Sequence, residues 1–578
     1  MTFYLPLSTI QPRTASVGRE INALKAVGLD AEQSAPSWAT AAQTVEEILA
    51  EYRKKQGSRN PLSRILCLIH GRGPANIRKL LEMLPPAWAD HAVASIYALS
   101  MPGERRKQLG AYFTPPHLVD HLVSRLRKFG MDPVQDRLRD SAAGGAAFLV
   151  PLARIKAAAW KAKGASDAAI VSRLRSQLIG REIEKDLAAV ANSLLRRMLV
   201  RELGMSAKLA RRVKLVRTGD SLDQKSAARD RVDHEVGNPP FLRLRSDDWR
   251  LRREIFSEIA SGRLNMYAIF VRRALDEVPA RGLVGYVMPA SFLGGPEFQS
   301  FRRRVLQIAE VLAIDLIEKR SGVFLGAIQD VCFVILRRRE SAVIRPDKSR
   351  AASGLLRHDG GFSEKGVAEI HTDGAPWQLP GLQQHDPATL KDWGYRATVG
   401  YLVANRQPER LHKRAAKGRF PMIWAKAITS DGLLDFRRGA AFKGWGWADA
   451  PENAPYVVRD PCVAVQRTSA RGQKRRLNAA AIPEAFIRKH GGVVGENHVI
   501  LIVPITAQAV PPQTLADALN TPAVSAELDR VCGSASISVR LLESIRLGKP
   551  PRQAMKKAAH TTPLGLGVHL GSGCKPCR

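Results

Sequence analysis

Four short segments with apolar residues in the first half of the chain are candidate strands, and each ends in or leads to a polar residue. They are the run that ends at Asp140, residues 178–182 ending at Glu182, residues 213–216 leading to Asp220, and residues 232–236 leading to Asn238. Short apolar runs bounded by turn residues are typical of buried strands. Because parallel strands share one carboxyl edge, we expect these polar ends to form a site there. The pattern predicts an open α/β sheet.

Helical periodicity surrounds these runs. Residues 1–105 are predicted to form a partly amphipathic helical region, with clear patterns at 41–52 and 77–84, and residues 117–123 begin a further helix. The step from Asp140 to Glu182 is 42 residues, which is long for one crossover helix. We therefore expect residues 166–177 to form an additional helix.

The second half of the chain follows a different pattern. Residues 346–392 are rich in Gly and Asp and are predicted to be a connector with short strands. Beyond it, strands are predicted at 393–405, 421–427, 457–466 and 493–504, with helical or mixed segments at 515–519 and 537–544. A chain of 578 residues is too large for one compact core, so we expect two or three domains.

The net charge of the chain indicates which class of partner it binds. Lys and Arg number 89 against 54 Asp and Glu, which gives a net charge of +35 and a pI near 10.4. A positive surface favours a polyanionic partner, and charge alone fits RNA as well as DNA. No apolar run reaches membrane-spanning length, and residues 1–18 lack the order of a signal peptide. We expect a prokaryotic, cytoplasmic, nucleoid-associated protein with no membrane partner.

The cysteines and carboxylates do not predict a metal. Six scattered cysteines fit a reducing compartment. Cys574 and Cys577 form one CxxC pair, and a structural zinc site needs two more ligands, of which only His569 is near. Glu182 and Glu184 alone are weak evidence for magnesium. We expect no metal site.

The most informative candidate chemistry is Asn238-Pro239-Pro240-Phe241. An amine conjugated to an aromatic ring is a poor nucleophile, because its lone pair is drawn into the ring. The Asn238 side-chain oxygen and the Pro239 carbonyl can each accept an N–H from such an amine and expose its lone pair. Phe241 supplies an aromatic face for a base turned out of a duplex. For an isolated match, a Pro-Pro turn closing a strand is the simpler interpretation.

Other segments occur with this turn in a defined order. Gly-Ala-Tyr-Phe-Thr-Pro-Pro comes first at 110–116, then Asp140 with small residues through 147, then the strand ends Glu182 and Asp220. Small residues after a strand let the backbone approach a ligand, and strand-end carboxylates can bind ribose hydroxyls. With the Asn-Pro-Pro-Phe turn, these segments resemble the gamma-class N6-adenine DNA methyltransferases of restriction-modification systems. The resemblance covers roughly residues 110–336.

The resemblance implies a fold and a domain order. The expected fold is an α/β, Rossmann-like S-adenosylmethionine-dependent methyltransferase sheet with an N-terminal helical region and a C-terminal mixed α+β target-recognition domain. We expect the helical region at 1–105, the catalytic domain at 106–345, the connector at 346–392, the target-recognition domain at 393–560 and a tail at 561–578. In the last domain the resemblance rests on Val-Gly-Tyr at 399–401, Gly-Glu-Asn-His at 495–498 and Ser-Ala-Ser-Ile at 534–537.

The resemblance also implies residue roles. The cofactor S-adenosyl-L-methionine would be bound by Tyr112, Thr114, Asp140, Ala142, Gly144, Glu182 and Asp220. Glu182 would hold its ribose hydroxyls and Asp220 its adenine amino group. The catalytic residues that hold the target adenine would be Asn238, Pro239, Pro240 and Phe241.

The loop after Asp140 departs from the family pattern, acidic-Pro-Ala-Cys-Gly-x-Gly. Ser141, Ala143 and Ala146 replace its Pro, its Cys and its last Gly. Ala146 is tolerable unless its backbone requires a positive φ. This change motivates one alternative, a catalytically degenerate member of the family that still binds DNA.

The expected activity is site-specific adenine-N6 methylation of a flipped base in double-stranded DNA. We expect a monomeric modification enzyme of a type II restriction-modification system, paired with a separate restriction endonuclease. In the C-terminal domain, residues 471–476 are the best local candidate for contact with the DNA backbone. An RNA adenine or protein glutamine methyltransferase would use the same Asn-Pro-Pro-aromatic turn and is a further alternative.

Overall fold

The computed structural model divides into two units, Met1–Gly381 and Leu382–Arg578, which are described separately. It describes residues 38–54, 61–101, 105, 113–223, 232–244, 254–259, 264–318, 331–342, 348–357, 360–377, 379–380, 388–468, 475–506, 509–531 and 536–551. Tyr112, the expected tail 561–578 and residues 471–474 lie outside this part of the chain.

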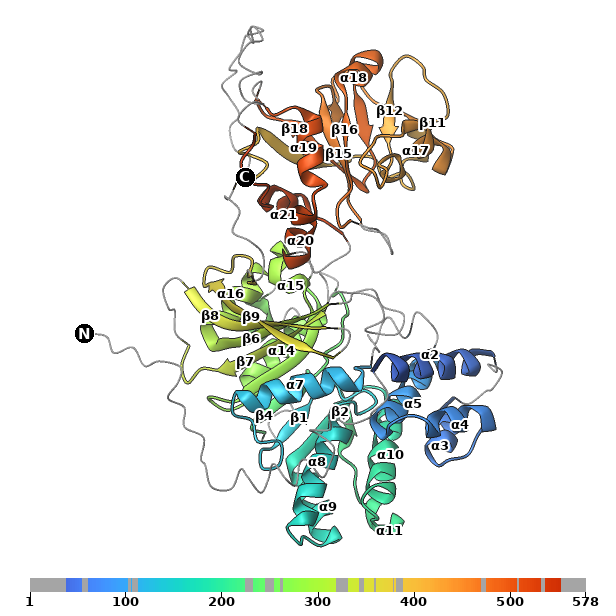
Figure 1. The fold of residues 1–578 in the computed structure, drawn as a ribbon, viewed down its shortest axis with the longest axis vertical. Helices are drawn as coiled ribbons and strands as arrows, with labels where there is room; N and C mark the ends of the chain where they lie inside the picture. Colours follow the sequence, from blue (N-terminus) through green and yellow to red (C-terminus); the bar gives the residue numbers. More distant parts are fainter. Residues whose placement is uncertain are drawn as a thin grey trace, which may run out of the picture. The chain divides into compact units, whose positions relative to one another are not determined.

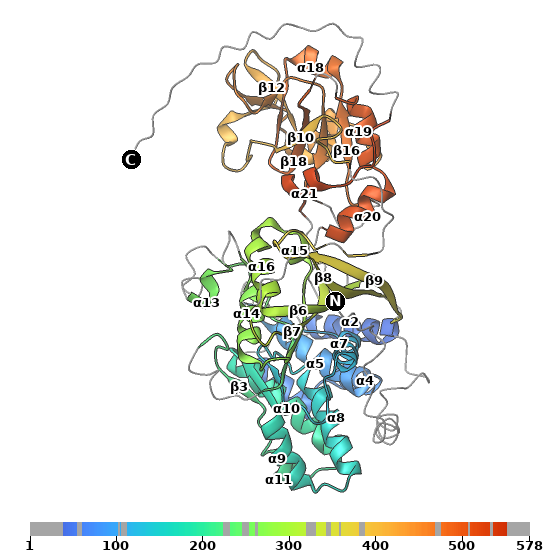
Figure 2. The same cartoon turned by 90° about the vertical axis from the view of Figure 1, so that its left-hand side faces the viewer.

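The first unit is built on a nine-stranded sheet with the order β3-β2-β1-β4-β5-β7-β6-β8-β9 (Figures 1 and 2). Its parallel part comprises β1 (Leu138–Asp140), β2 (Leu178–Glu182), β3 (Val216–Thr218), β4 (His234–Gly237) and β5 (Leu283–Pro289). β7 (Val331–Arg338) lies antiparallel between β5 and β6 (Ala309–Ile317). The strand order reverses between β1 and β4, which is where an open α/β sheet forms its ligand site. The predicted Rossmann-like sheet is confirmed.

Helices cover both faces of this sheet. Alternate residues of β5 belong to two different cores, with Val287 in one and Met288 in the other. The first core takes α7 (Pro116–Lys128), α8 (Leu149–Ala162) and α10 (Lys185–Arg201), and the second takes α14 (Met266–Glu277) and α16 (Gln299–Ile308). Short helices α11 (Ala207–Ala210), α13 (Glu254–Ser257) and α15 (Ser291–Gly294) and the turn η2 (Pro296–Phe298) lie between them.

The long step between the first two strands contains two helices, as expected. After α8 the chain forms α9 (Asp167–Gln177). Ser166 caps this helix, because its side chain accepts a hydrogen bond from Ala169 N at 3.3 Å. The additional crossover helix predicted at 166–177 is therefore confirmed.

The N-terminal helices share the first core. They are α2 (Trp38–Lys54), α3 (Pro61–Ile69), α4 (Ala75–Glu82) and α5 (Pro86–Ser100), and they pack with α7, α8 and α10 (Figure 1). The region predicted to be helical is thus a layer of the first unit, and α5 also contacts the loop after β1.

The sheet continues beyond the expected domain boundary at residue 345. β8 (Lys348–Leu356) pairs in parallel with β6, and β9 (Phe362–His371) pairs antiparallel to β8. Ala351, Ala368 and Ile370 bury their side chains in the second core. The stretch 346–392 therefore differs from a simple connector. Its small residues hide the alternating pattern by which strands are recognised.

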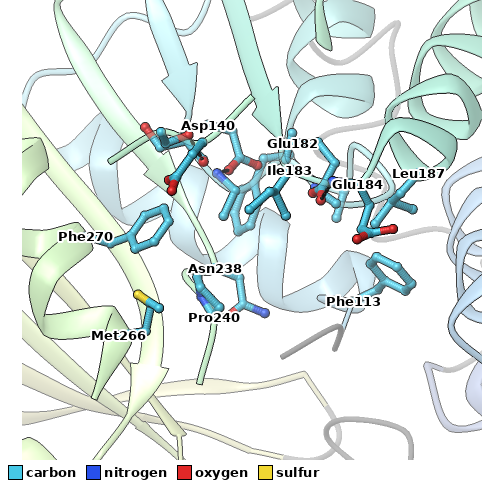
Figure 3. Close-up of a pocket in the computed structure, with 18 of the residues that line it drawn as sticks. Phe113, Asp140, Glu182, Ile183, Glu184, Leu187, Asn238, Pro240, Met266 and Phe270 are labelled. Atoms are coloured by element: carbon cyan, nitrogen blue, oxygen red, sulfur yellow. Dashed lines mark hydrogen bonds between the residues drawn. The ribbon is translucent and has the colours of Figure 1, made fainter. Parts of the chain in front are cut away.

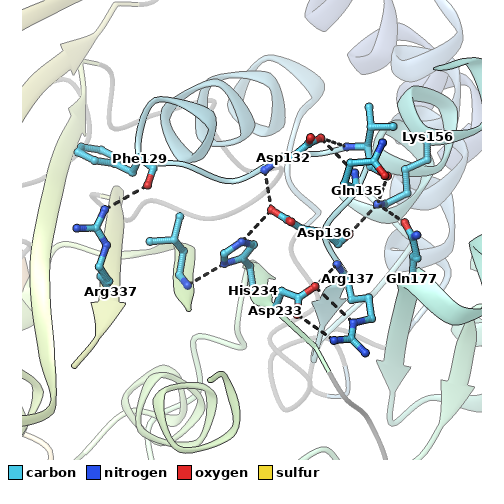
Figure 4. Close-up of polar contacts among 12 residues, drawn as sticks. Phe129, Asp132, Gln135, Asp136, Arg137, Lys156, Gln177, Asp233, His234 and Arg337 are labelled. Carbon is cyan, nitrogen blue, oxygen red and sulfur yellow. Dashed lines mark hydrogen bonds and ion pairs between the residues drawn. The ribbon is translucent and has the colours of Figure 1, made fainter. Parts of the chain in front are cut away.

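Polar side chains join the strand ends opposite the carboxyl edge (Figure 4). His234 Nδ1, at the start of β4, accepts the Leu283 N–H of β5 at 2.9 Å, so its Nε2–H faces Asp136 Oδ2 at 3.0 Å. Asp233 accepts from the Arg137 backbone N–H at 2.8 Å and from its guanidinium. These bonds fix the register of β1, β4 and β5 below the site.

The second unit contains two small sheets and short helices, the mixed α+β composition expected for it. One sheet has the order β10-β18-β15-β16 and the other β11-β13-β12-β17-β14. The strands are β10 (Tyr395–Val399), β11 (Leu411–His412), β12 (Arg419–Ile423), β13 (Trp447–Asp449), β14 (Val457–Val458), β15 (Cys462–Gln466), β16 (Ala479–Ile482), β17 (Val493–Gly495) and β18 (Val499–Pro504). The helices and turns are η3 (Pro408–Arg410), η4 (Ala425–Ala427), α17 (Phe436–Lys443), α18 (Glu484–His490), α19 (Pro512–Leu519), α20 (Pro522–Val531) and α21 (Val539–Ser544).

Two predicted strands of this unit are each split between the sheets. Residues 457–466 form β14 and β15, and residues 493–504 form β17 and β18. Pro461 interrupts the first run, and a turn at Glu496 interrupts the second, where Val499 N donates to Glu496 O at 2.8 Å. In the part of the chain that the structure describes, no helix is long and apolar enough to cross a membrane.

Candidate active site

An open cavity of about 1020 Å³ lies at the carboxyl ends of β1 to β4 (Figure 3). Eight of the eleven predicted site residues line it: Thr114, Asp140, Ala142, Gly144, Glu182, Asp220, Asn238 and Pro240. Tyr112 is outside the described residues. Pro239 is buried, and Phe241 is half-buried and packs against both cores of the unit, so neither belongs to the lining.

The loop after β1 forms one wall of the cavity through its backbone. Ala142 N donates to Asp140 Oδ1 at 3.0 Å, and Gly144 N donates to Glu182 Oε2 at 2.9 Å. Two loop residues have positive φ, Gly144 at 51° and Ala146 at 63°. Ala146 thus meets the condition that makes its Cβ unfavourable, because a left-handed conformation costs a non-glycine residue about 1–2 kcal/mol.

Close contacts leave little room for side chains around this loop. A Cβ at Gly144 would lie 3.0 Å from the Phe113 ring, and a Cβ at Gly145 would lie 2.5 Å from the Ala94 Cβ of α5. At the end of β4, a Cβ at Gly237 would lie 2.7 Å from Asp140 Oδ1. Glycine at these positions therefore allows the loop to pack closely against Phe113, α5 and the end of β4.

Four carboxylates line the cavity: Asp140, Glu182, Glu184 and Asp220. Burial raises the pKa of Asp140 well above its usual range, against the opposing hydrogen bond from Ala142, and burial also raises the pKa of Glu182. A positively charged ligand would compensate this desolvation. Among the described residues, no three His, Cys, Asp or Glu side chains are grouped as metal ligands.

A buried ion pair supports the floor of the site. Arg139 Nε donates to Glu235 Oε2 at 2.6 Å, and Glu235 Oε1 accepts from Ser141 N and from Tyr286 Oη, both at 3.0 Å. Glu235 therefore positions the first residue of the loop. Sequence reasoning missed this group, although Glu235 lies inside the segment 232–236 that was expected to be a buried strand, and a charged residue there was its signal.

Apolar side chains form the remaining walls. In Figure 3, Met266 and Phe270 of α14 lie on one side of Asn238, and Phe113 and Leu187 lie on the other. Ile183, which follows Glu182, also lines the cavity and is 55% exposed. Apolar walls combined with a few polar groups suit flat ring systems that carry hydrogen-bonding edges. The sequence motifs did not reveal these wall residues.

The first unit combines an open α/β sheet with a cavity at the carboxyl ends of its parallel strands, the fold expected of S-adenosylmethionine-dependent methyltransferases. Residues 166–324 match the family model described as Eco57I restriction-modification methylase. The matched segment includes Glu182, Asp220 and Asn238. This segment is therefore similar to restriction-modification methylase domains.

Two curated proteins are similar to parts of the chain. The type II methyltransferase M.BsuBI of Bacillus subtilis is 29% identical over 106 residues, which cover 18% of this chain and 21% of the relative. The type II methyltransferase M.PstI of Providencia stuartii is 22% identical over 256 residues, which cover 42% of this chain and 50% of the relative. The chain therefore spans half or less of the length of these curated relatives.

One solved structure resembles most of the chain. It is that of the DrdV–DNA complex, with a TM-score of 0.50, 12% sequence identity, and coverage of 95% of this chain and 72% of that chain. At this identity the likeness shows the fold alone.

Proposed function

We propose that this protein is a site-specific DNA methyltransferase that transfers the methyl group of S-adenosylmethionine to N6 of adenine in duplex DNA. One observation carries the proposal: Asn238 and Pro240 line the same cavity as the strand-end carboxylates Asp140, Glu182 and Asp220. Asn238, which can accept a hydrogen bond from a planar amine, is thus close to carboxylates that suit the positively charged S-adenosylmethionine. The matching family model supports the methylase part of the proposal.

The described residues fit the cofactor. S-adenosylmethionine supplies an electrophilic methyl group on a positively charged sulfur. Glu182 and Asp220 would accept hydrogen bonds from its ribose hydroxyls and adenine amino group, and Asp140 adds negative charge nearby. Ile183, Leu222 and Phe270 provide apolar surface for its adenine ring. Gly144 lines the cavity beside the Phe113 ring, which a Cβ at this position would approach to 3.0 Å.

Asn238 and Pro239 would act on the target amine. The Asn238 side-chain oxygen and the Pro239 carbonyl accept its two N–H groups, which directs the nitrogen lone pair away from the ring. Holding the amine in this position supplies most of the rate enhancement, through orientation and preorganised hydrogen bonds. Adenine N6 is out of reach inside a stacked duplex, so the base must be turned out, with Phe241 as its proposed stacking partner.

The biological setting is part of the proposal. A stand-alone modification enzyme of a type II restriction-modification system would act as a monomer beside a separate endonuclease, in the cytoplasm of a prokaryote. The relatives named as type II methyltransferases and the net charge of +35 support this setting. RNA adenine and protein glutamine remain the competing substrates, because both carry a planar amine.

The test is methyl transfer by an Asn238→Ala variant. We expect transfer of radiolabelled methyl to DNA to fall about 100- to 1000-fold, the usual cost of losing one preorganised donor or acceptor in an active site. Calorimetry should show nearly unchanged cofactor binding, because Asn238 is proposed to hold the target. Asp220→Ala is the matched control, since it should weaken cofactor binding instead.

Three outcomes would contradict the proposal. Transfer at the parent rate by Asn238→Ala would remove this residue from the site. Label incorporated into RNA or a protein glutamine, with none in DNA, would change the substrate. A parent protein that binds DNA but no cofactor would be a degenerate member of the family.

A further inference from the structure

Exposed basic side chains of the second unit gather around helix α17. Lys413 lies in the turn after β11, Lys426 in η4, and Arg437, Arg438 and Lys443 along α17 itself, and all five are exposed. α17 packs against η4 and β12, and β11 and β12 both pair with β13 (Figure 1). Residues separated by up to 30 positions in the sequence, from 413 to 443, thus form one positive surface.

Aromatic rings lie between these lysines. Phe442 is 55% exposed, and the Nζ atoms of Lys426 and Lys443 lie 5.6 Å and 5.5 Å from its ring centroid. Lys413 Nζ lies 5.8 Å from the Trp445 ring centroid. Cation–π contacts of this kind hold the ammonium groups near the rings and leave N–H donors facing solvent. Below, we call Lys413, Lys426, Phe442, Lys443 and Trp445 the lysine–aromatic face.

The neighbouring acidic side chains have other partners, although the charge of buried Glu496, which accepts from His498 N at 3.0 Å, also interacts with that of Lys443. Asp449 contacts His412 Nε2 at 2.6 Å and Arg419 Nε at 3.1 Å, and Asp435 caps α17 by accepting from Arg438 N at 2.9 Å. Within the described residues, none of the three lysines of the face forms an ion pair. Their charge is therefore available to an anionic partner.

The basic run favoured by the sequence has a different role where the structure describes it. The Arg475 guanidinium donates to Asn520 O at 3.2 Å and to Ser430 O. Arg476 is only 7% exposed. Arg475 thus joins segments within the second unit and Arg476 is buried, so the two described residues of the run 471–476 do not support the expectation that it contacts DNA.

We propose that the lysine–aromatic face binds duplex DNA, with Lys413, Lys426 and Lys443 on backbone phosphates and Phe442 on sugar or base edges. This inference rests on the proposed function for the choice of DNA. Contacts between lysines and phosphates position a protein on DNA and supply affinity that does not depend on the base sequence. An exposed aromatic ring adds apolar contact. Exposed lysines and an exposed aromatic ring occur together here, and the lysines supply the phosphate contacts on which affinity for a duplex depends.

The test compares two variants of the full-length protein that lose equal charge. In the first, Lys413, Lys426 and Lys443 become Gln. In the control, Lys208, Arg212 and Lys214 of the first unit, which are also exposed, become Gln. Binding to a fluorescent duplex is measured between about 50 and about 200 mM salt, where each lost phosphate contact lowers the slope of log K against log salt by about 0.9.

We expect the slope of the first variant to be smaller in magnitude than the parent's by about 2.7, because three phosphate contacts are lost. The ratio of the parent's binding constant to the variant's should therefore fall about 40-fold between the lowest and the highest salt concentration. The control variant should keep the parent's slope. A Phe442→Ala variant should bind more weakly at every salt concentration with the slope unchanged. Unaltered circular dichroism of each variant verifies folding, since all substituted side chains are exposed.

Methyl transfer on the same proteins separates this inference from the proposed function. At saturating DNA the first variant should reach the parent's rate, because the cavity lies in the other unit. If the first variant keeps the parent's salt slope while the parent methylates DNA, the lysine–aromatic face does not bind DNA, and the proposed methyltransferase function is unaffected. If the parent methylates no DNA, the proposed function fails on its own readout. Selective loss of binding to single-stranded RNA would overturn the choice of duplex DNA.

Discussion

A Gly145→Ala substitution tests whether the N-terminal helices support the cofactor loop. The added Cβ would lie 2.5 Å from the Ala94 Cβ and 3.7 Å from the Ala94 Cα of α5. Gly145 is not among the residues with positive φ, so the effect is steric and does not come from backbone strain. Overpacking in a closed contact costs about 1–3 kcal/mol. We expect a loss of that size in the free energy of unfolding of the first unit, together with weaker S-adenosylmethionine binding.

The control is the double variant Ala94→Gly, Gly145→Ala. Ala94→Gly alone places a glycine inside α5, which costs about 1 kcal/mol in helix propensity. It also removes the atom that the new Cβ would meet, so the two costs should be less than additive. Urea titration followed by tryptophan fluorescence gives stability, and calorimetry gives affinity. Strictly additive costs, or a Gly145→Ala variant as stable and as tight-binding as the parent, would refute the reasoning.

Three further predictions concern the same cavity. Asp220→Ala and Glu182→Ala should each weaken S-adenosylmethionine binding at least about 10-fold, because a hydrogen bond to a charged group is worth about 1.5–3 kcal/mol; unchanged calorimetric affinity in both would show that these carboxylates do not hold the ligand. Burial raises the pKa of Asp140 and Glu182 in the folded protein above their values in the unfolded chain. The ligand-free protein therefore becomes more stable as the pH falls from the folded-state pKa to the unfolded-state pKa. A cationic ligand, by contrast, binds best when these carboxylates are ionised. The thermal stabilisation by S-adenosylmethionine should therefore shrink as pH is lowered, and an Asp140→Asn variant that keeps the full pH dependence would exclude Asp140 as its source. Ala146→Gly should change the free energy of unfolding by less than about 1 kcal/mol. Glycine relieves about 1–2 kcal/mol of strain from the left-handed backbone, but the buried methyl group is lost and the unfolded chain gains conformational freedom. A gain of several kcal/mol in urea titration would mean that the strain is larger than the positive φ implies.

The strand ends could be predicted because their chemistry is local. Asp140 and Glu182 end short segments that contain apolar residues, Asn238 follows another, and parallel pairing brings such ends to one edge. The start of β3 could not be predicted as well. Residues 213–216 were expected to form the strand, and only Val216 of these belongs to β3. Val213 and Leu215 are buried before the strand begins, so apolar pattern alone does not separate them from it.

The supporting contacts could not be predicted, because they depend on tertiary packing. The Arg139–Glu235 pair joins residues 96 positions apart, and Met266 and Phe270 reach the cavity from a helix that no cofactor motif marks. Likewise, β8 and β9 are recognised only by their pairing with β6 and with each other. Tyr112, by contrast, is a sequence expectation outside the described residues.

The central claim is tested most directly by identifying the methylated product. Full-length protein is incubated with mixed-sequence duplex DNA and S-adenosylmethionine that carries a deuterated methyl group, and the DNA is digested to nucleosides for mass spectrometry. The account predicts deuterated N6-methyladenine with the parent protein and its near disappearance with Asn238→Ala. Deuterated methylcytosine, or unlabelled DNA from a protein that binds both cofactor and DNA, would contradict it.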